Sequence, residues 1–144
     1  ASYGIPSIAI SLETDAEHHF SYSEVVDFTV AAAVARRAAR HALTHPFPGG
    51  ADVLKVDVPS DAALDTPWRL TRLTRQRYYE PAVTAGPDGL PRLSGYYRHV
   101  DATTLEPDSD AQALLVDRVV SVCPLTIDLS AGFTREGADG WLDL

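Results

Sequence analysis

The sequence predicts an α/β domain, in which helices cover a sheet. A short apolar stretch near the start, from Ile5 to Ile10, has the composition of a strand buried on both faces. A long segment with helical spacing follows it. Next, Leu54, Val56 and Val58 alternate with polar residues, as in a strand with one covered face. This order of strand, loop, helix and strand is typical of open α/β sheets, although it does not distinguish one α/β family from another.

Length and cysteine content favour one cytoplasmic domain. A chain of 144 residues is the size of a single domain with one core. Its only cysteine, Cys123, excludes an internal disulfide and a zinc cluster built from thiolates, and we expect it to be an inert core thiol. No apolar run approaches the roughly 20 residues that span a bilayer, and the start shows no signal-peptide pattern. We therefore expect a cytoplasmic protein without membrane contact.

The charge composition indicates a salt-rich habitat. The net charge is −8, with 14 Asp against 6 Glu and 11 Arg against a single lysine, Lys55. Proteins of salt-loving archaea have this composition because carboxylates keep a surface hydrated. An acidic chain is also a poor general binder of nucleic acid, whose partners are usually basic. We expect a halophilic, haloarchaeal source and a chain that is not a general nucleic-acid binder.

The first strand and the loop after it carry the first candidate ligand contacts. Pro6 cannot donate to a sheet ladder and therefore belongs at the start of the strand. Ser11 then falls at the carboxyl end, where open α/β sheets bind their ligands. Ser7 is a second candidate, although strand-terminal serines usually bond to local backbone. His18 and His19 lie in the following loop, where they either reach a ligand or remain solvated.

The helix is expected to begin at a capping box formed by Ser21 and Glu24. Arg36, Arg37 and Arg40 mark its outer side, and His45-Pro46 ends it. The residues expected on its buried face are Val25, Phe28, Ala32, Ala35, Ala39 and Leu43.

His41 and His45 are four residues apart, a spacing that can hold a metal. Histidines near a helix carboxyl end are also favoured by the helix dipole, which is the simpler interpretation.

A projecting hairpin is predicted in the middle of the chain. Residues 68–83 have the composition of a long strand, and Gly86-Pro87-Asp88-Gly89 is a strong turn signal. A returning strand runs through Tyr96 and Tyr97 to Val100. Because few large aliphatic residues lie on this hairpin, we expect it to project from the core and to be covered by another subunit.

The last part of the chain supplies a short helix and a strand. Residues 106–109 are expected to cap a helix over 110–117, which turns Ala113 and Leu114 inward. Residues 119–122 form a further strand that ends before Pro124. The tail over 130–144 is rich in glycine and acidic residues, with Trp141 and Leu142 as its only anchors.

Four segments of the chain resemble, in order, segments of the SurE survival-protein family. Together they cover most of residues 4–125, and four in order are far more specific than any one of them. Two departures are Cys123, where the family usually has Thr, and Asp57, where Asn is common. The segments are Gly4-Ile5-Pro6-Ser7-Ile8-Ala9-Ile10-Ser11, Val56-Asp57-Val58-Pro59, Leu70-Thr71-Arg72-Leu73 with Arg77-Tyr78, and Ser109-Asp110 followed by Val120-Ser121-Val122-Cys123-Pro124-Leu125.

The resemblance implies a Rossmann-like, three-layer fold with a projecting β-hairpin. Residues 1–59 would form the end of the Rossmann-like sheet and its helix, 60–107 the hairpin region, and 108–144 the carboxyl-terminal helix, strand and tail. It further implies a homodimer or homotetramer in which hairpins are exchanged, with Thr71, Arg72, Arg75, Arg77 and Tyr78 as candidate hairpin contacts.

The resemblance also implies membership in a family of metal-dependent nucleotidases, which remove phosphate from nucleoside monophosphates. Its site holds one divalent cation, Mg²⁺ or Mn²⁺, through two consecutive aspartates, a serine and an asparagine, which are oxygen ligands of the kind these cations prefer. This chain has no Asp-Asp pair and no asparagine. The resemblance therefore implies a carboxyl-terminal portion of such an enzyme, with no catalytic residue of its own, no bound cation and no activity alone.

Three residues are candidate contacts of the substrate pocket: Ser11, Ser109 and Asp110. For Ser109 and Asp110 the simpler alternative is capping of the helix that follows them.

Three functions remain open. The first is a portion of a nucleotidase, and the second is a non-catalytic dimerisation module. The third is a single-stranded nucleic-acid binder that uses Arg69, Arg72, Arg75 and Arg77 beside tyrosines.

Overall fold

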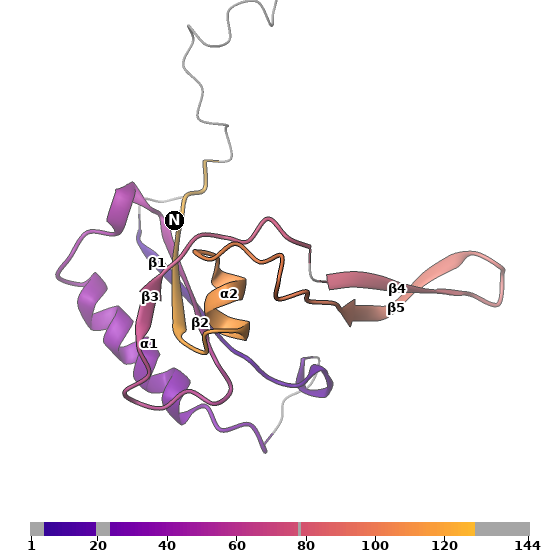
Figure 1. Cartoon of the computed structure of the whole chain (residues 1–144), viewed down its shortest axis with the longest axis horizontal. Coiled ribbons are helices and arrows are strands. Elements are labelled where there is room, and N and C mark those ends of the chain that lie inside the picture. Colours follow the sequence, from indigo (N-terminus) through magenta and orange to yellow (C-terminus); the bar gives the residue numbers. More distant parts are fainter. Residues whose placement is uncertain (1–4, 20–23, 78, 129–144) are drawn as a thin grey trace, which may run out of the picture.

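The computed structural model describes residues 5–19, 24–77 and 79–128 (Figure 1). The strands are β1 (Ser7–Leu12), β2 (Val53–Val58), β3 (Trp68–Leu70), β4 (Tyr79–Ala85), β5 (Pro91–Arg98) and β6 (Val120–Leu125). The helices are α1 (Thr29–Ala42), α2 (Asp110–Leu115) and two single 3₁₀ turns, Ala16–His18 and Pro48–Gly50. No helix within the described ranges is long and apolar enough to cross a membrane.

Four strands form a mixed sheet in the order β1-β2-β6-β3. β1 and β2 are parallel, β6 is antiparallel to β2, and β3 is parallel to β6. The carboxyl ends of β1 and β2 therefore meet at one edge of the sheet, beside the first residues of β6. In an open α/β sheet this is the edge at which ligands bind.

Helices lie on both faces of this sheet, which confirms the predicted α/β class. On one face Val34 of α1 packs with Val56 and Val58 of β2, both fully buried, in the central apolar core. Side chains alternate along a strand, so Lys55 and Asp57 point to the other face, where Asp110 of α2 contacts Lys55. β2 thus lies between the core and the candidate site: its apolar side chains face the core, and its polar side chains face the site.

The buried face of α1 differs from the predicted one. Ala31, Val34 and Ala38 are buried, whereas Val25, Phe28 and Leu43 are 80%, 54% and 85% exposed. Nearly every position of this segment is apolar or small, so the helical period alone does not select a face. The small alanines allow close approach to the sheet and decide the orientation.

The start of α1 also differs. The helix begins at Thr29, where the Asp27 carboxylate accepts a hydrogen bond from the Thr29 amide at 2.8 Å. The predicted capping box was therefore wrong in placing the start near Ser21 and Glu24: Glu24 precedes the helix, and Ser21 lies outside the described residues.

β1 is not buried on both faces as predicted. Ile8, Ile10 and Leu12 are half-buried against the core, while Ala9 and Ser11 are exposed. The cause is its position at the margin of the sheet formed by the described strands.

The predicted long strand over 68–83 is two strands. β3 joins the central sheet, residues 71–77 cross from the sheet to the hairpin, and β4 begins at Tyr79. β4 and β5 form a separate two-stranded ribbon that extends away from the core in Figure 1. The turn at Gly86–Gly89 lies where the sequence predicts it, with Gly89 at a φ of +73° that favours glycine.

The final elements largely follow prediction. α2 begins at Asp110, and Ala113 is fully buried, while Leu114 is half-buried. β6 extends through Pro124 to Leu125, so Pro124 lies inside the strand rather than ending it. Cys123 on β6 is 1% exposed, and burial raises the pKa of its thiol. The predicted tail over 130–144 lies outside the described residues.

Candidate functional site

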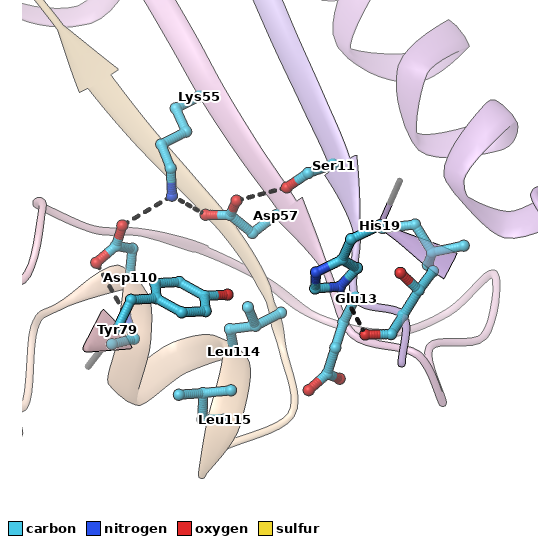
Figure 2. A pocket seen from close by; sticks show the side chains of 12 residues that line it. Ser11, Glu13, His19, Lys55, Asp57, Tyr79, Asp110, Leu114 and Leu115 are labelled. Atoms are coloured by element: carbon cyan, nitrogen blue, oxygen red, sulfur yellow. Dashed lines mark hydrogen bonds and ion pairs between the residues drawn. The ribbon is translucent and has the colours of Figure 1, made fainter. Parts of the chain in front are cut away.

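A pocket of about 420 Å³ opens at the carboxyl ends of β1 and β2 (Figure 2). Ser11 and the residues just after β1 form one side, and Lys55 and Asp57 of β2 form the floor. Asp110 and Leu114 of α2 line the opposite side, and Tyr79 and His19 also line the pocket. The pocket thus lies at the edge where the first strand was expected to bring Ser11.

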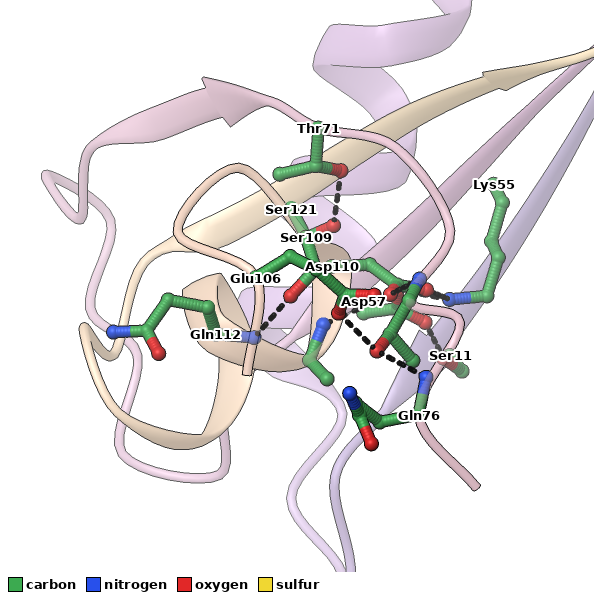
Figure 3. A network of polar contacts seen from close by, with 12 residues as sticks. Ser11, Lys55, Asp57, Thr71, Gln76, Glu106, Ser109, Asp110, Gln112 and Ser121 are labelled. Atoms are coloured by element: carbon green, nitrogen blue, oxygen red, sulfur yellow. Dashed lines mark hydrogen bonds and ion pairs between the residues drawn. The ribbon is translucent and has the colours of Figure 1, made fainter. Parts of the chain in front are cut away.

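Lys55 joins Asp57 and Asp110, two of the three acidic residues that line this pocket (Figures 2 and 3). Its ammonium binds Asp57 directly and donates to Asp110 at 2.8 Å. The carboxylates are nearly buried, with side chains 8% and 5% exposed, and the lysine side chain is 31% exposed. Ser11 Oγ donates to the second oxygen of Asp57 at 2.8 Å, which completes a chain from β1 to α2.

The charge of Lys55 is held by these neighbours. Burial alone lowers the pKa of a lysine because it disfavours the charged form. Here the hydrogen bonds and negative charges of Asp110 and Asp57 outweigh burial, so the pKa of Lys55 is raised above its ordinary value. The lysine therefore stays cationic and is not available as a general base near neutral pH.

Asp110 also holds the segment that leads into the hairpin (Figure 3). Its Oδ1 accepts hydrogen bonds from the Thr74 amide at 2.8 Å and from the Ala111 amide at 2.9 Å. Glu106 accepts from the Thr74 hydroxyl at 2.8 Å and from the Arg75 amide at 3.1 Å. The Asp110 carboxylate thus contacts Lys55 in the pocket floor, the first turn of α2 and the segment that leads to the hairpin.

Ser109 is buried behind this network and does not line the pocket. Its Oγ accepts a hydrogen bond from the Gln112 amide at 3.1 Å, the geometry of a helix N-cap. Of the three candidate pocket residues, the structure therefore brings Ser11 and Asp110 together around Lys55 and places Ser109 at the start of α2.

Replacing Ser109 with Ala is expected to lower the free energy of unfolding by about 1 kcal/mol, because the cap is lost. Ser109→Asp, which keeps an acceptor but adds a charge at a fully buried position, is expected to be worse. Urea unfolding monitored by circular dichroism measures both. A Ser109→Ala variant as stable as the parent would contradict the capping role.

Arg118 ties the loops beyond both parallel strands to the end of α2. Its guanidinium pairs with Glu13 after β1 at 2.8 Å and with Asp61 after β2 at 2.6 Å, and it donates to the Leu114 carbonyl at 3.0 Å. Burial alone raises the pKa of Glu13, but hydrogen bonds from Ser60 and Arg118 outweigh burial, so this pKa is lowered.

Arg118 also has a φ of +54°, an unfavourable conformation for a residue with a side chain. We expect Arg118→Ala to be less stable than Arg118→Gly by about 1 kcal/mol, because both lose the ion pairs but only glycine accepts this φ freely. Thermal unfolding at pH 7 compares the two variants; equal stability would show that the backbone strain is negligible.

The same variants test the lowered pKa of Glu13. Its ionised form contributes stability above the ordinary pKa of 4.5, and that contribution disappears as pH falls through the lower, folded-state pKa. The difference between parent and Arg118→Gly should therefore shrink as the pH is lowered below 4.5. A difference that stays constant into strong acid would contradict this.

Known proteins are similar to this chain in sequence and in fold. The family model described as "Survival protein SurE" matches residues 1–80, which is more than half of the chain. The chain belongs to the SurE family. "5'-nucleotidase SurE" of Thermococcus gammatolerans is 45% identical over 133 residues, which are 91% of this chain and 49% of that protein. The protein of the same name from Methanocaldococcus jannaschii is 33% identical over 134 residues, covering 89% of this chain and 48% of the relative.

A solved structure gives the same result at the level of fold. The crystal structure of the SurE protein from Aquifex aeolicus superimposes with a TM-score of 0.62 and 25% sequence identity, covering 96% of this chain and 51% of that one. The chain thus spans about half the length of the relatives it matches. These likenesses agree with the Rossmann-like, three-layer SurE fold expected from the sequence.

The candidate hairpin contacts of this SurE chain are not gathered in one place. Thr71 is buried, and its hydroxyl hydrogen-bonds to Ser121 at 2.8 Å. Arg72 pairs with Asp108 at 2.8 Å on the surface. Arg75 and Arg77 are exposed in the crossing segment before β4, and Tyr78 lies outside the described residues.

The described part of the chain does not contain a site that fits the family's divalent cation. No group of three or more His, Cys, Asp and Glu side chains within it is arranged to hold a metal. Of the three pocket carboxylates, Asp57 and Asp110 are bridged by the Lys55 ammonium, and Glu13 pairs with Arg118 instead. His41 and His45, four apart in sequence, stack on each other with ring centroids 4.0 Å apart, and His45 bonds to local backbone.

The principal residues that the sequence analysis overlooked are Lys55, Asp57 and Tyr79. A signal for the first two was present, because two charged residues alternate with buried valines on one short strand. Such residues must share the opposite face and find partners there. Tyr79 had no comparable signal, since its place at the pocket depends on how the hairpin leaves the sheet.

Proposed function

We propose that this chain forms part of a metal-dependent nucleotidase that hydrolyses nucleoside monophosphates and related phosphomonoesters. The observation that carries this proposal is the pocket at the carboxyl ends of β1 and β2, in a chain that belongs to the SurE family. The names of its relatives support nucleotidase activity. The chain is the carboxyl-terminal portion of that enzyme, and the cation, Mg²⁺ or Mn²⁺, is held by ligands outside these 144 residues.

In this proposal the chain supplies the substrate pocket and its rigidity. A divalent cation held by ligands outside this chain would supply polarisation of the phosphoryl group and activation of water. Ser11, Lys55 and Asp57 form a fixed polar wall, because each is hydrogen-bonded to the next. Arg118 holds the loops that border this wall.

The test is an assay of phosphate release from AMP by the protein that carries this chain together with its flanking segments. Because the composition suggests a halophile, the assay is run in high salt, with Mg²⁺, with Mn²⁺ and with a chelator. We expect release that depends on the cation, and none from the 144 residues alone. Metal-independent release, or robust release by the 144 residues alone, would contradict the proposal.

A second candidate is a non-catalytic dimerisation module, and the hairpin favours it. Val83 of β4 and Leu93 and Tyr97 of β5 are 58%, 73% and 68% exposed on a ribbon that extends from the core. Exposed apolar residues on such a ribbon are suited to pair with another subunit in a homodimer or homotetramer. Light scattering, which measures the mass of the assembly, tests this by comparing Leu93→Asp with the parent. A stable oligomer without cation-dependent phosphate release from the protein with its flanking segments would favour this candidate.

Binding of single-stranded nucleic acid has weaker support. Two of the four arginines in the candidate strand already pair with carboxylates, Arg69 with Asp117 and Arg72 with Asp108. The positive charge left for a phosphate backbone is therefore small. No measurable binding of an oligonucleotide at low salt is the expected result.

A further inference from the structure

The charge of the pocket is unsuited to a phosphate group. Its lining carries three carboxylates, from Glu13, Asp57 and Asp110, against the charge of Lys55 and that of Arg118, which pairs with Glu13 at 2.8 Å. The ammonium of Lys55 is already engaged by Asp57 and Asp110. A phosphate dianion placed here would meet excess negative charge in a partly dehydrated site, where like charges repel strongly.

The same lining is suited to sugar hydroxyls. An ionised carboxylate oxygen accepts about two hydrogen bonds, and Oδ1 of Asp57 receives one from the Ser11 hydroxyl. The exposed Ser11 hydroxyl spends its only proton on this bond and so presents acceptor positions to a ligand. Both groups accept from an O–H donor, which a ribose supplies and an ionised phosphate does not.

Aromatic side chains stand beside this polar wall. Tyr79 and His19 line the pocket and also an adjoining apolar hollow formed with Pro81, Leu93 and Tyr96. In Figure 2 the Tyr79 ring lies beside Asp110, and the His19 ring lies on the other side of the view, near Glu13. Tyr79 meets Tyr96 edge-on, with centroids 5.1 Å apart, and is 43% exposed.

The ring of His19 is held in place from both nitrogens. Nδ1 bonds to the Tyr96 hydroxyl, and Nε2 bonds to the Thr14 carbonyl at 3.1 Å. The ring lies nearly parallel to Tyr96, at an interplanar angle of 16°. An aromatic surface whose orientation is fixed before binding loses less freedom when a flat ligand stacks on it.

We propose that this pocket receives the nucleoside part of the substrate, with ribose against Ser11 and Asp57 and the base stacked at Tyr79 and His19. The phosphate then points out of the pocket, away from the carboxylates. This inference rests on the proposed function and specifies which end of the substrate this chain recognises. It makes Tyr79 a specificity-determining residue for nucleotides over simpler phosphomonoesters.

The first test measures binding of adenosine, which lacks the phosphate, to the protein with its flanking segments. We expect adenosine to bind and inorganic phosphate at equal concentration not to displace it. Tyr79→Leu should weaken adenosine binding about tenfold, the size of effect expected for loss of one stacking ring. Tyr79→Phe, which keeps the ring, should stay within about twofold of the parent.

Tyr97→Leu is the matched control. Tyr97 lies on the same hairpin, is 68% exposed, and lines neither the pocket nor the hollow. Undetectable adenosine binding, displacement by phosphate, or equal effects of the two leucine variants would overturn the inference. Should Tyr79→Leu not fold, nuclear Overhauser contacts between adenine and tyrosine ring protons in the parent decide the matter, and their absence overturns it.

A kinetic test separates this inference from the proposed function. For Tyr79→Leu, KM for AMP should rise about tenfold, while KM for ribose 5-phosphate should not change. If both substrates are hydrolysed and Tyr79→Leu has no effect on KM, the nucleotidase proposal stands and the pocket assignment is overturned. If adenosine binding depends on Tyr79 but the protein hydrolyses no phosphomonoester, the pocket assignment stands and the nucleotidase proposal is overturned.

Discussion

Replacing Lys55 with Met is expected to lower the free energy of unfolding by about 3 to 5 kcal/mol. The substitution keeps the length of the side chain but leaves Asp57 and Asp110, both nearly buried, without their shared cation. Two uncompensated carboxylates on one face of β2 repel each other and lose hydrogen bonds from the ammonium. Urea denaturation in high salt measures the change.

Arg36→Met is the control for this experiment. Arg36 is exposed on α1 and makes no ion pair with a described carboxylate, so its replacement should change stability by less than about 0.5 kcal/mol. Equal small effects of the two substitutions would show that the bridge at Lys55 contributes nothing.

The bridge also has a pH signature. Since the pKa of Lys55 is raised in the folded protein, its contribution is complete below the ordinary value of 10.5 and is lost as pH rises through the folded-state pKa. The parent should therefore lose stability in strong alkali more steeply than Lys55→Met. If the parent and Lys55→Met lose stability equally as the pH rises, the pKa of Lys55 is not raised in the folded protein.

The second large effect is expected at Asp110. Asp110→Ala removes the acceptor of the Thr74 and Ala111 amides together with one partner of Lys55, and we expect a loss of about 3 kcal/mol. Asp110→Asn keeps an acceptor oxygen and should lose less. Because Thr74 begins the path to the hairpin, its amide should exchange with solvent faster in Asp110→Ala.

Asp108→Ala serves as the comparison for Asp110→Ala. Asp108 pairs with Arg72, but both side chains are 63% exposed, and surface pairs of this kind contribute at most about 1 kcal/mol. An Asp110→Ala variant no less stable than Asp108→Ala, with unchanged exchange at Thr74, would mean that the network in Figure 3 does not hold the hairpin.

Elements bounded by strong local signals could be predicted from the sequence. The alternation in β2, the turn at Gly86–Gly89 and the serine cap of α2 are each determined by a few neighbouring residues. The three-layer arrangement of the fold was predicted from the resemblance to the SurE family. The start and buried face of α1 could not be predicted, because its alanines give nearly every helix face the same hydrophobicity and packing on the sheet selects one.

The candidate site was only partly predictable for a related reason. The position of Ser11 follows from the direction of one strand, which local sequence indicates. The bridge from Asp57 through Lys55 to Asp110 joins residues up to 55 positions apart and depends on the antiparallel insertion of β6 beside β2. Tyr79 depends on the break between β3 and β4, where the continuous β propensity of residues 68–83 gives no sign that the chain leaves the sheet.

The burial of Cys123 has a practical consequence for experiments on the hairpin. A thiol that is 1% exposed and has a raised pKa presents little thiolate to maleimides or other alkylating reagents. Spectroscopic probes can therefore be attached to cysteines introduced at the tip of the ribbon while the native thiol remains unlabelled. Distances between such probes would report directly how two ribbons approach each other.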